Sequence, residues 1–191
     1  MAPTISAGAV TPNTSLLFYR SPGSPTAARA TVNGGVGLLA NGAFSLTRQI
    51  HFTEVTTVAA SCDTILVYAA SNGFATAVQA SGGTLIGLGN NYNFDPHWTT
   101  ITATDDSALF YNKTAGTGAW GTLKGGMFAQ TGSSTSFSKG LTNIGGTSNS
   151  LLFYTKGSAS GSTATLSGGV YEFHGAFGGL RNDWAIISGG K

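Results

Sequence analysis

The residues best suited to chemistry in this chain of 191 residues lie in two short polar segments that carry aromatic side chains. One segment runs from residue 90 to residue 98, the other from residue 181 to residue 184, and a lone tryptophan lies between them. A sugar needs such a combination, because its C–H surface stacks on an apolar ring and its hydroxyls need fixed donors and acceptors. The candidate sugar-binding residues are therefore Asn91, Tyr92, Asn93, Asp95, His97, Trp98, Trp120, Arg181, Asn182, Asp183 and Trp184.

Catalytic chemistry has less support in the sequence. The histidines His51, His97 and His174 show no metal-binding spacing, and the single cysteine, Cys62, cannot build a zinc site. The chain has no Gly-x-Ser-x-Gly stretch for a serine nucleophile and no phosphate-binding glycine pattern. Two carboxylates for glycoside hydrolysis can come from distant parts of a chain, so a hydrolase stays an alternative. We expect a protein without enzymatic activity, metal ion or cofactor.

Charge and hydropathy limit the partners. The net charge is only +2, and the nine Lys and Arg residues are scattered. Nucleic acids and anionic membranes are bound by clusters of such residues, so we expect neither as a partner. No apolar run is long enough to span a membrane. No charged-then-apolar leader opens the sequence, which predicts a cytoplasmic protein or export by a leaderless route.

The elements that must position these residues are repeated. An apolar motif ending in tyrosine occurs four times, with starts separated by 49, 43 and 43 residues. The copies are residues 16–19, 65–68, 108–111 and 151–154. Each is followed by a glycine pair, namely Gly34-Gly35, Gly82-Gly83, Gly125-Gly126 and Gly168-Gly169. A third, apolar-x-x-apolar element recurs at residues 55–58, 98–101, 141–144 and 184–187. Three markers in phase indicate a repeat architecture.

Each repeat is long enough for about four short strands. Glycine is abundant, with 29 residues, and charged residues make up only 8% of the chain. Such a composition is typical of short strands joined by tight turns, and the glycine pairs supply the positive φ that tight hairpins need. Turn-forming side chains precede each motif and are expected to bond nearby backbone amides; they are Thr14, Asp63, Asp106 and Asn149.

We predict an all-β fold, a small β-propeller of four four-stranded blades with one blade per repeat. The repeats cover about residues 16–64, 65–107, 108–150 and 151–191. Residues 1–15 are expected to add a strand to the sheet of the last repeat, because an open sheet edge invites pairing with other chains. The alternative is a homo-oligomer in which two chains share one larger ring.

The order of these markers resembles the repeats of lectin-type β-propellers, in the tachylectin-like group and related bacterial and fungal proteins. The closest matches are residues 97–101 (HWTTI) and 112–118 (NKTAGTG). The resemblance implies non-catalytic binding of glycans in shallow pockets between adjacent blades, and several weak sites that gain strength through multivalency. Related propellers commonly have five to seven blades, whereas this chain has four repeats.

The tryptophans leave a second interpretation open. Val55 and Leu141 occupy the repeat position of Trp98 and Trp184, which also suits burial in a core. If the tryptophans are instead sugar platforms, only two of the four pockets contain one, and only these two would bind strongly. Tyr92 likewise has two interpretations: it packs within its loop, or it contacts a ligand. A protein-binding or structural scaffold without sugar binding is the alternative function.

Overall fold

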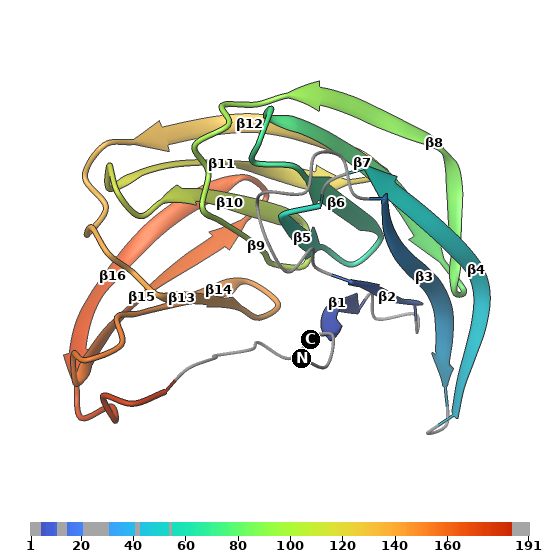
Figure 1. The fold of residues 1–191 in the computed structure, drawn as a ribbon. Helices are drawn as coiled ribbons and strands as arrows, with labels where there is room; N and C mark the ends of the chain where they lie inside the picture. Colours follow the sequence, from blue (N-terminus) through green and yellow to red (C-terminus); the bar gives the residue numbers. More distant parts are fainter. Residues whose placement is uncertain (1–4, 11–14, 21–30, 41–42, 54, 185–191) are drawn as a thin grey trace. The chain divides into compact units, whose positions relative to one another are not determined.

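The computed structural model describes residues 5–10, 15–20, 31–40, 43–53 and 55–184, which form sixteen β-strands and no helix. The strands make four separate sheets of four, each an antiparallel meander in which consecutive strands pair (Figure 1). No helix in the described part of the chain could therefore cross a membrane. The all-β prediction, with four strands for each repeat, is confirmed.

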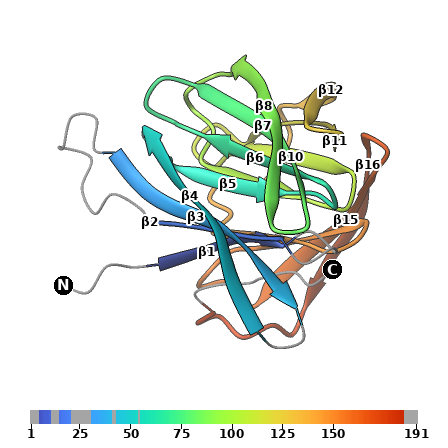
Figure 2. The same cartoon turned by 90° about the vertical axis from the view of Figure 1, so that its right-hand side faces the viewer.

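The chain divides into two compact units, each of which holds two sheets. The first unit is Met1–His97 with Lys124–Met127, and the second is Trp98–Leu123 with Phe128–Lys191. The first sheet consists of β1 (Ile5–Val10), β2 (Ser15–Arg20), β3 (Thr31–Ala40) and β4 (Ala43–Thr53). The second consists of β5 (Thr57–Ala60), β6 (Thr64–Tyr68), β7 (Phe74–Ser81) and β8 (Thr84–Asn93). Figure 2 shows β3 and β4 as the long hairpin of the first sheet.

The second unit contains the third and fourth sheets. The third sheet consists of β9 (Thr100–Ala103), β10 (Ser107–Asn112), β11 (Thr117–Lys124) and β12 (Met127–Ser134). The fourth consists of β13 (Asn143–Gly146), β14 (Ser150–Tyr154), β15 (Ser160–Ser167) and β16 (Val170–Gly178). The turn between β11 and β12 clusters with the first unit.

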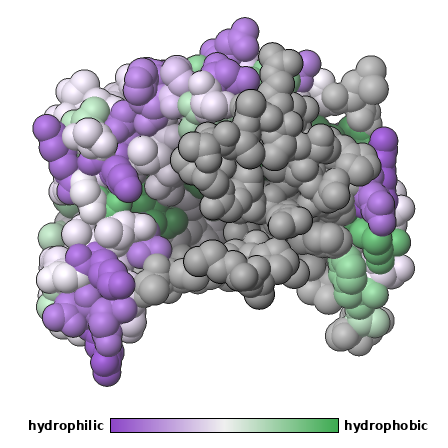
Figure 3. All heavy atoms as spheres, viewed as in Figure 1, coloured by the Kyte–Doolittle hydropathy of each residue, from purple (hydrophilic) through white to green (hydrophobic). Residues whose placement is uncertain are grey.

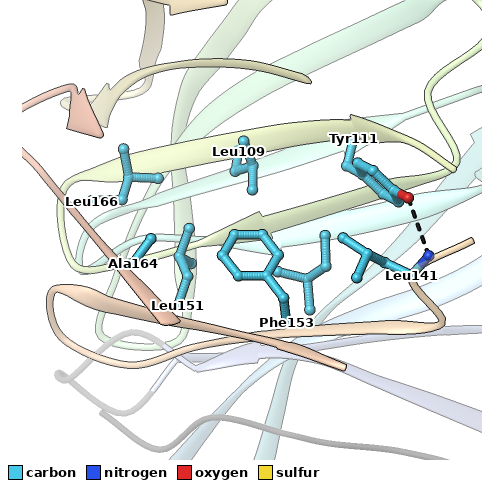
Figure 4. Close-up of a cluster of buried hydrophobic side chains, with 8 residues drawn as sticks. Leu109, Tyr111, Leu141, Leu151, Phe153, Ala164 and Leu166 are labelled. Atoms are coloured by element: carbon cyan, nitrogen blue, oxygen red, sulfur yellow. Dashed lines mark hydrogen bonds between the residues drawn. The ribbon is translucent and has the colours of Figure 1, made fainter. Parts of the chain in front are cut away.

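The repeated motif is the second strand of every sheet, and in the second and third sheets it is apolar because both of its faces are covered. All five residues of β6 are buried, as are the first five of β10. In the second unit, Leu109 and Tyr111 of β10 pack on Leu151 and Phe153 of β14 (Figure 4). In this unit the motif therefore fills the space between neighbouring sheets.

The sheets begin one strand earlier than the predicted repeats. The apolar-x-x-apolar element was expected to end a repeat, but β5, β9 and β13 pair with the motif strand that follows them. Residues 5–10 form a strand as predicted, yet β1 pairs with β2 of the first sheet and not with the last repeat. In both cases a segment pairs with its nearest successor, which costs the least loop-closure entropy.

Three of the four glycine pairs form the predicted turns. Gly82-Gly83, Gly125-Gly126 and Gly168-Gly169 join the third strand of a sheet to the fourth, and all six have positive φ, between 55° and 77°. The prediction is wrong for Gly34-Gly35. That pair lies within β3, opposite Tyr19 and Phe18 of β2. The corresponding turn is the one that joins Ala40 to Ala43, because those residues pair at the hairpin end.

The fourth strands extend through polar and glycine-rich residues. β8, β12 and β16 run to Asn93, Ser134 and Gly178. These strands lie at the edges of their sheets and are largely exposed, so no apolar alternation marks them.

Candidate functional site

An aromatic pocket of about 320 Å³ lies in the second unit, between the outer strand of the third sheet and the fourth sheet. Its wall comes from the end of β12, the segment that follows it, and strands β14, β15 and β16. The lining residues are Ser134, Ser136, Phe137, Ser138, Leu141, Phe153, Ser162, Tyr171 and Phe173.

Packed rings form one wall of this aromatic pocket. The ring centroid of Phe137 lies 5.4 Å from that of Tyr171 and 6.0 Å from that of Phe153. The half-buried ring of Trp120 supports them, with its centroid 4.9 Å from Tyr171 and 6.4 Å from Phe137. These distances lie in the range of attractive ring contacts, so the wall is held in place by its own packing. Phe173, 58% exposed, presents its ring to solvent.

Hydroxyl groups line the rest of the pocket. Ser134 Oγ accepts a hydrogen bond from the amide of Ser136, at 3.1 Å. Among the described residues, the hydroxyls of Ser136, Ser138 and Ser162 make no side-chain hydrogen bond. The pocket thus places three available hydroxyls, each a donor and an acceptor, beside apolar rings.

The motif tyrosine positions the segment from Phe137 to Leu141. Tyr111 Oη donates to the carbonyl of Ser138 at 2.7 Å and accepts from the amide of Leu141 at 3.1 Å (Figure 4). Burial raises the pKa of Tyr111, which keeps the phenol neutral and able to donate. The tyrosines of two other motifs act alike, since Tyr68 Oη donates to Asp95 O and Tyr154 Oη to Arg181 O. Each tyrosine therefore anchors the segment that leaves the outer strand of its own sheet.

Tyr171 provides a spectroscopic test of the pocket. Burial raises its pKa from 10.0 to about 12. The neutral phenol is favoured in the folded protein, so its contribution to stability is complete below pH 10 and is lost as the pH rises towards 12. We expect the late part of the tyrosinate absorbance titration to be smaller by one tyrosine in Tyr171→Phe than in wild type, with the contribution of Tyr111 remaining. Tyr92→Phe, altered outside the pocket, is the control and should keep the full late step. A late step of unchanged amplitude in Tyr171→Phe would contradict this assignment.

A wider depression of about 620 Å³ shares Leu141 with the aromatic pocket. Its remaining lining residues are Thr99, Thr100, Lys113, Thr114, Gly140 and Thr142. The segments that carry the family resemblance, residues 97–101 and 112–118, supply four of these. Two of its threonines serve the fold: Thr99 Oγ1 accepts from the amide of Lys113 at 3.0 Å, and Thr142 Oγ1 accepts from that of Lys156 at 2.8 Å.

The first predicted segment lies outside the aromatic pocket, and several of its polar groups bind one another. His97 donates to the carboxylate of Asp95 through its backbone amide at 2.9 Å and through Nδ1. The side-chain hydrogen bond lowers the pKa of Asp95. Asn91 accepts from the hydroxyl of Thr76, and Tyr92 stacks on Phe94 with ring centroids 5.2 Å apart. Asn93 is exposed.

The second predicted segment is likewise exposed and paired with itself. Arg181 donates to Asp183 through Nε at 3.0 Å and Nη2 at 2.8 Å. This ion pair raises the pKa of Arg181 and lowers that of Asp183. The side chain of Asn182 is exposed, and its carbonyl accepts from the amide of Gly157. Trp184 is 37% exposed, with its ring centroid 5.9 Å from that of Tyr154.

Neither of the other tryptophans lines the pocket. Trp98 is half-buried and contacts Phe110 edge-on at 5.9 Å, and Trp120 supports the pocket from behind. None of the eleven predicted residues is among the lining residues.

The pocket and the predicted residues nevertheless share repeat positions. Asn91, Asn93, Asp95 and Trp98 stand 43 residues before Ser134, Ser136, Ser138 and Leu141. The residues predicted from the sequence thus occupy the same part of the repeat as the pocket, in a copy with more conspicuous side chains. Phe137, a lone aromatic residue in a serine-rich segment, was the signal that sequence reasoning missed.

No family model matches the chain, and no curated protein matches it. Solved structures do match. A functionally unknown protein from Desulfotomaculum acetoxidans superposes with a TM-score of 0.62 at 14% identity, over 92% of this chain and 57% of that one. The fragment HIRA(644-1017) superposes with a TM-score of 0.50 at 9% identity, over 90% of this chain and 56% of that one.

The chain therefore spans little more than half the length of these neighbours. Likeness at such low identity establishes the fold alone. The fold is all-β, with repeated four-stranded antiparallel sheets, and its neighbours are propeller-like.

Proposed function

We propose that the protein binds carbohydrate without catalysis and that the aromatic pocket of the second unit is one binding site. A pyranose ring stacks its C–H face on an exposed aromatic ring, and its hydroxyls exchange hydrogen bonds with serine side chains and backbone groups. Phe173 offers the ring, and Ser136, Ser138 and Ser162 offer the hydroxyls. The observation that carries the proposal is this set of available hydroxyls beside packed aromatic rings.

The chemistry of the lining supports binding over hydrolysis. Glycoside hydrolysis uses two carboxyl groups on either side of the scissile bond. The nine described lining residues are serines, aromatic residues and one leucine, without a carboxylate or imidazole. Their polar groups can hold a ligand but offer no acid or base with a suitable pKa.

The repeat supports more than one site. In this proposal each sheet is one blade of a four-bladed propeller of the lectin type, and each seam between blades carries a version of the pocket. The copies differ in strength because the lining positions that hold asparagine and aspartate in one repeat hold serine in the next. Several weak sites on one particle bind a glycan-coated surface more tightly than one site does.

Phe173→Ala tests the aromatic pocket. Because Phe173 is 58% exposed, the replacement should leave the fold intact while it removes the stacking surface. We expect a glycan array to identify a ligand for wild type, and calorimetry to show its affinity for Phe173→Ala reduced at least roughly tenfold, or about 1.4 kcal/mol. Val170→Ala, on the same strand and 68% exposed, is the matched control and should bind like wild type.

A second pair of variants separates the aromatic pocket from the residues predicted by sequence. Trp184→Ala removes the exposed ring of the second predicted segment. Loss of binding in Trp184→Ala with full binding in Phe173→Ala would move the site to that segment. An array on which wild type binds no glycan would overturn the proposed function.

Strand β16 favours one alternative, a protein-binding scaffold. Val170, Phe173 and Phe177 on this strand are 68%, 58% and 39% exposed. Exposed apolar side chains gathered on one element are typical of protein interaction sites. In that case Val170→Ala would weaken capture of a protein partner, and no glycan would compete for it.

A further inference from the structure

The wider depression next to the aromatic pocket carries a charge that the pocket lacks, and we call it the lysine depression. Its lining residues all belong to the second unit; they are Thr99, Thr100, Lys113, Thr114, Gly140, Leu141 and Thr142. Its volume is about 620 Å³, and it shares Leu141 with the aromatic pocket. Among the described lining residues of the two hollows, Lys113 alone is charged. A ligand that reaches both hollows therefore meets aromatic rings in one and a cation in the other.

Hydrogen bonds fix the backbone of Lys113 at the rim of the lysine depression. Its amide donates to Thr99 Oγ1 at 3.0 Å, and its carbonyl accepts from the amide of Gly140 at 2.9 Å. Lys113 is thereby tied to the residue before β9 and to the segment before β13. Its side chain is exposed, and the ammonium group makes no ion pair or hydrogen bond with any described residue. The three N–H donors of this group are therefore available to a ligand.

The fold uses part of the remaining polar groups in the depression. Besides accepting a backbone amide, Thr99 Oγ1 and Thr142 Oγ1 each donate to the carbonyl of a motif tyrosine, at 3.0 and 3.2 Å. The hydroxyls of Thr100 and Thr114, by contrast, make no side-chain hydrogen bond within the described part of the chain. The lysine depression thus offers a ligand one ammonium group and two hydroxyls.

Two further lysines surround the depression. A Cβ placed on Gly116, in the turn after β10, would lie 2.9 Å from Lys139 Cγ, so the stem of Lys139 covers this turn. The amide of Lys156 donates to Thr142 Oγ1 at 2.8 Å, which holds the backbone of Lys156 near the rim. Figure 3 shows hydrophilic colouring above and below a small hydrophobic patch on the side that bears β15 and β16. The surroundings of the depression therefore add positive charge to that of Lys113.

The carboxylates of the second unit lie away from Lys113 or are already paired. They belong to Asp105, Asp106, Glu172 and Asp183. The first two precede β10, whereas Lys113 follows it, and a strand of this length separates its ends by roughly 20 Å. Asp183 is held by Arg181 through two hydrogen bonds. Glu172 is an exposed residue of β16 outside the described lining of both hollows. None of these four forms an ion pair with Lys113.

The preceding repeat shows that the fold does not need this lysine. Ala70 stands 43 residues before Lys113, and its amide donates to Thr56 Oγ1 at 2.9 Å. The same backbone hydrogen bond is thus made with an alanine in one repeat and with a lysine in the next. The charge of Lys113 is an addition to the repeat, and its replacement should leave the backbone contact intact.

We propose that the glycan bound by this protein is acidic, with a sugar ring in the aromatic pocket and a sulfate or carboxylate of the same glycan beside Lys113 in the lysine depression. This inference rests on the proposed carbohydrate binding and adds the charge of the ligand. Leu141 lines both hollows, so neighbouring positions of one glycan reach both.

The chemistry of the two hollows favours an anionic substituent. Sulfate and carboxylate oxygens are hydrogen-bond acceptors, and they match the ammonium group of Lys113 and the hydroxyls of Thr100 and Thr114. A charge-assisted hydrogen bond is shorter and stronger than one between neutral groups. Because Lys113 is exposed, water and salt weaken the attraction, so the charge selects among glycans while the aromatic pocket supplies most of the affinity.

A glycan array that pairs neutral glycans with their sulfated and carboxylated forms tests this selection. Wild type should bind the acidic member of a pair about fivefold more tightly than the neutral one, which is the upper range for an exposed ion pair. The preference should shrink as the salt concentration rises. Lys113→Gln should abolish the preference, and Lys113→Glu should reverse it. Lys124→Gln is the matched control, because this exposed lysine lies at the opposite end of β11 from the turn that follows Lys113.

The outcomes separate the charge of the ligand from sugar binding itself. Phe173→Ala should weaken binding of the neutral and acidic members alike, since it acts on the ring. Equal affinity of wild type for both members would overturn the inference and leave sugar binding in place. A full preference for the acidic glycan in Lys113→Gln would equally overturn it, because the anion would then lie elsewhere. An array without any bound glycan would overturn both the inference and the proposed function.

Discussion

Leu109→Ala is expected to lower the free energy of unfolding of the second unit by about 3–5 kcal/mol. Leu109 is 0% exposed and belongs to a cluster with Leu151, Phe153 and Leu166 from the facing sheet. The substitution removes three buried carbons and leaves a cavity that strands of two hydrogen-bonded sheets cannot close. For a chain of this length the melting temperature should fall by roughly 10 °C, measured by scanning calorimetry.

The repeat provides a matched control for this loss. Leu152 has the motif position of Leu109 but is only half-buried. Leu152→Ala should therefore lower the free energy of unfolding by about 1 kcal/mol or less, because a half-buried leucine gains only part of the transfer free energy of full burial. Equal losses in the two variants would show that Leu109 does not serve as the inter-sheet filling.

The sequence was sufficient for the fold wherever a residue's environment is set by its near neighbours. The motif strands are apolar over their whole length, and the glycine pairs stand at hairpin ends, so both follow from local pattern and φ preference. Gly34-Gly35 led to a wrong turn prediction, because the pair has nearly the same spacing from its motif as the other pairs but lies inside a strand. The turn it seemed to mark lies seven residues later, between Ala40 and Ala43, since β3 and β4 form a longer hairpin than the others.

The candidate site was harder to predict because its wall comes from separate sheets. Phe137, Phe153 and Tyr171 meet only after the third and fourth sheets pack, and no spacing in the sequence encodes that contact. The aspartates before the motif strands show the same limit. Asp63 and Asp106 were predicted to bond nearby amides, whereas their carboxylates bind glycine amides 62 residues away. A turn-forming side chain and a turn-binding one look alike in sequence.

The second large effect is expected at Asp106, whose carboxylate binds the turn between β15 and β16 in the second unit. Asp106→Ala removes the carboxylate that accepts from Gly168 and from the hydroxyl of Ser107. Hydrogen bonds to a charged group contribute about 1.5–3 kcal/mol each, and the partly exposed site lowers that value. We expect a loss of about 2 kcal/mol in the free energy of unfolding, measured by urea denaturation.

Two readouts distinguish loss of the contact between Asp106 and the turn from a general loss of stability. Amide exchange of Gly168 and Gly169 should accelerate in Asp106→Ala more than that of residues in β10, because local opening of the turn no longer breaks a hydrogen bond. Asp106→Asn keeps an oxygen acceptor, so it should retain most of the stability. If Asp106→Asn is as unstable as Asp106→Ala, the charge and not the acceptor geometry holds the turn.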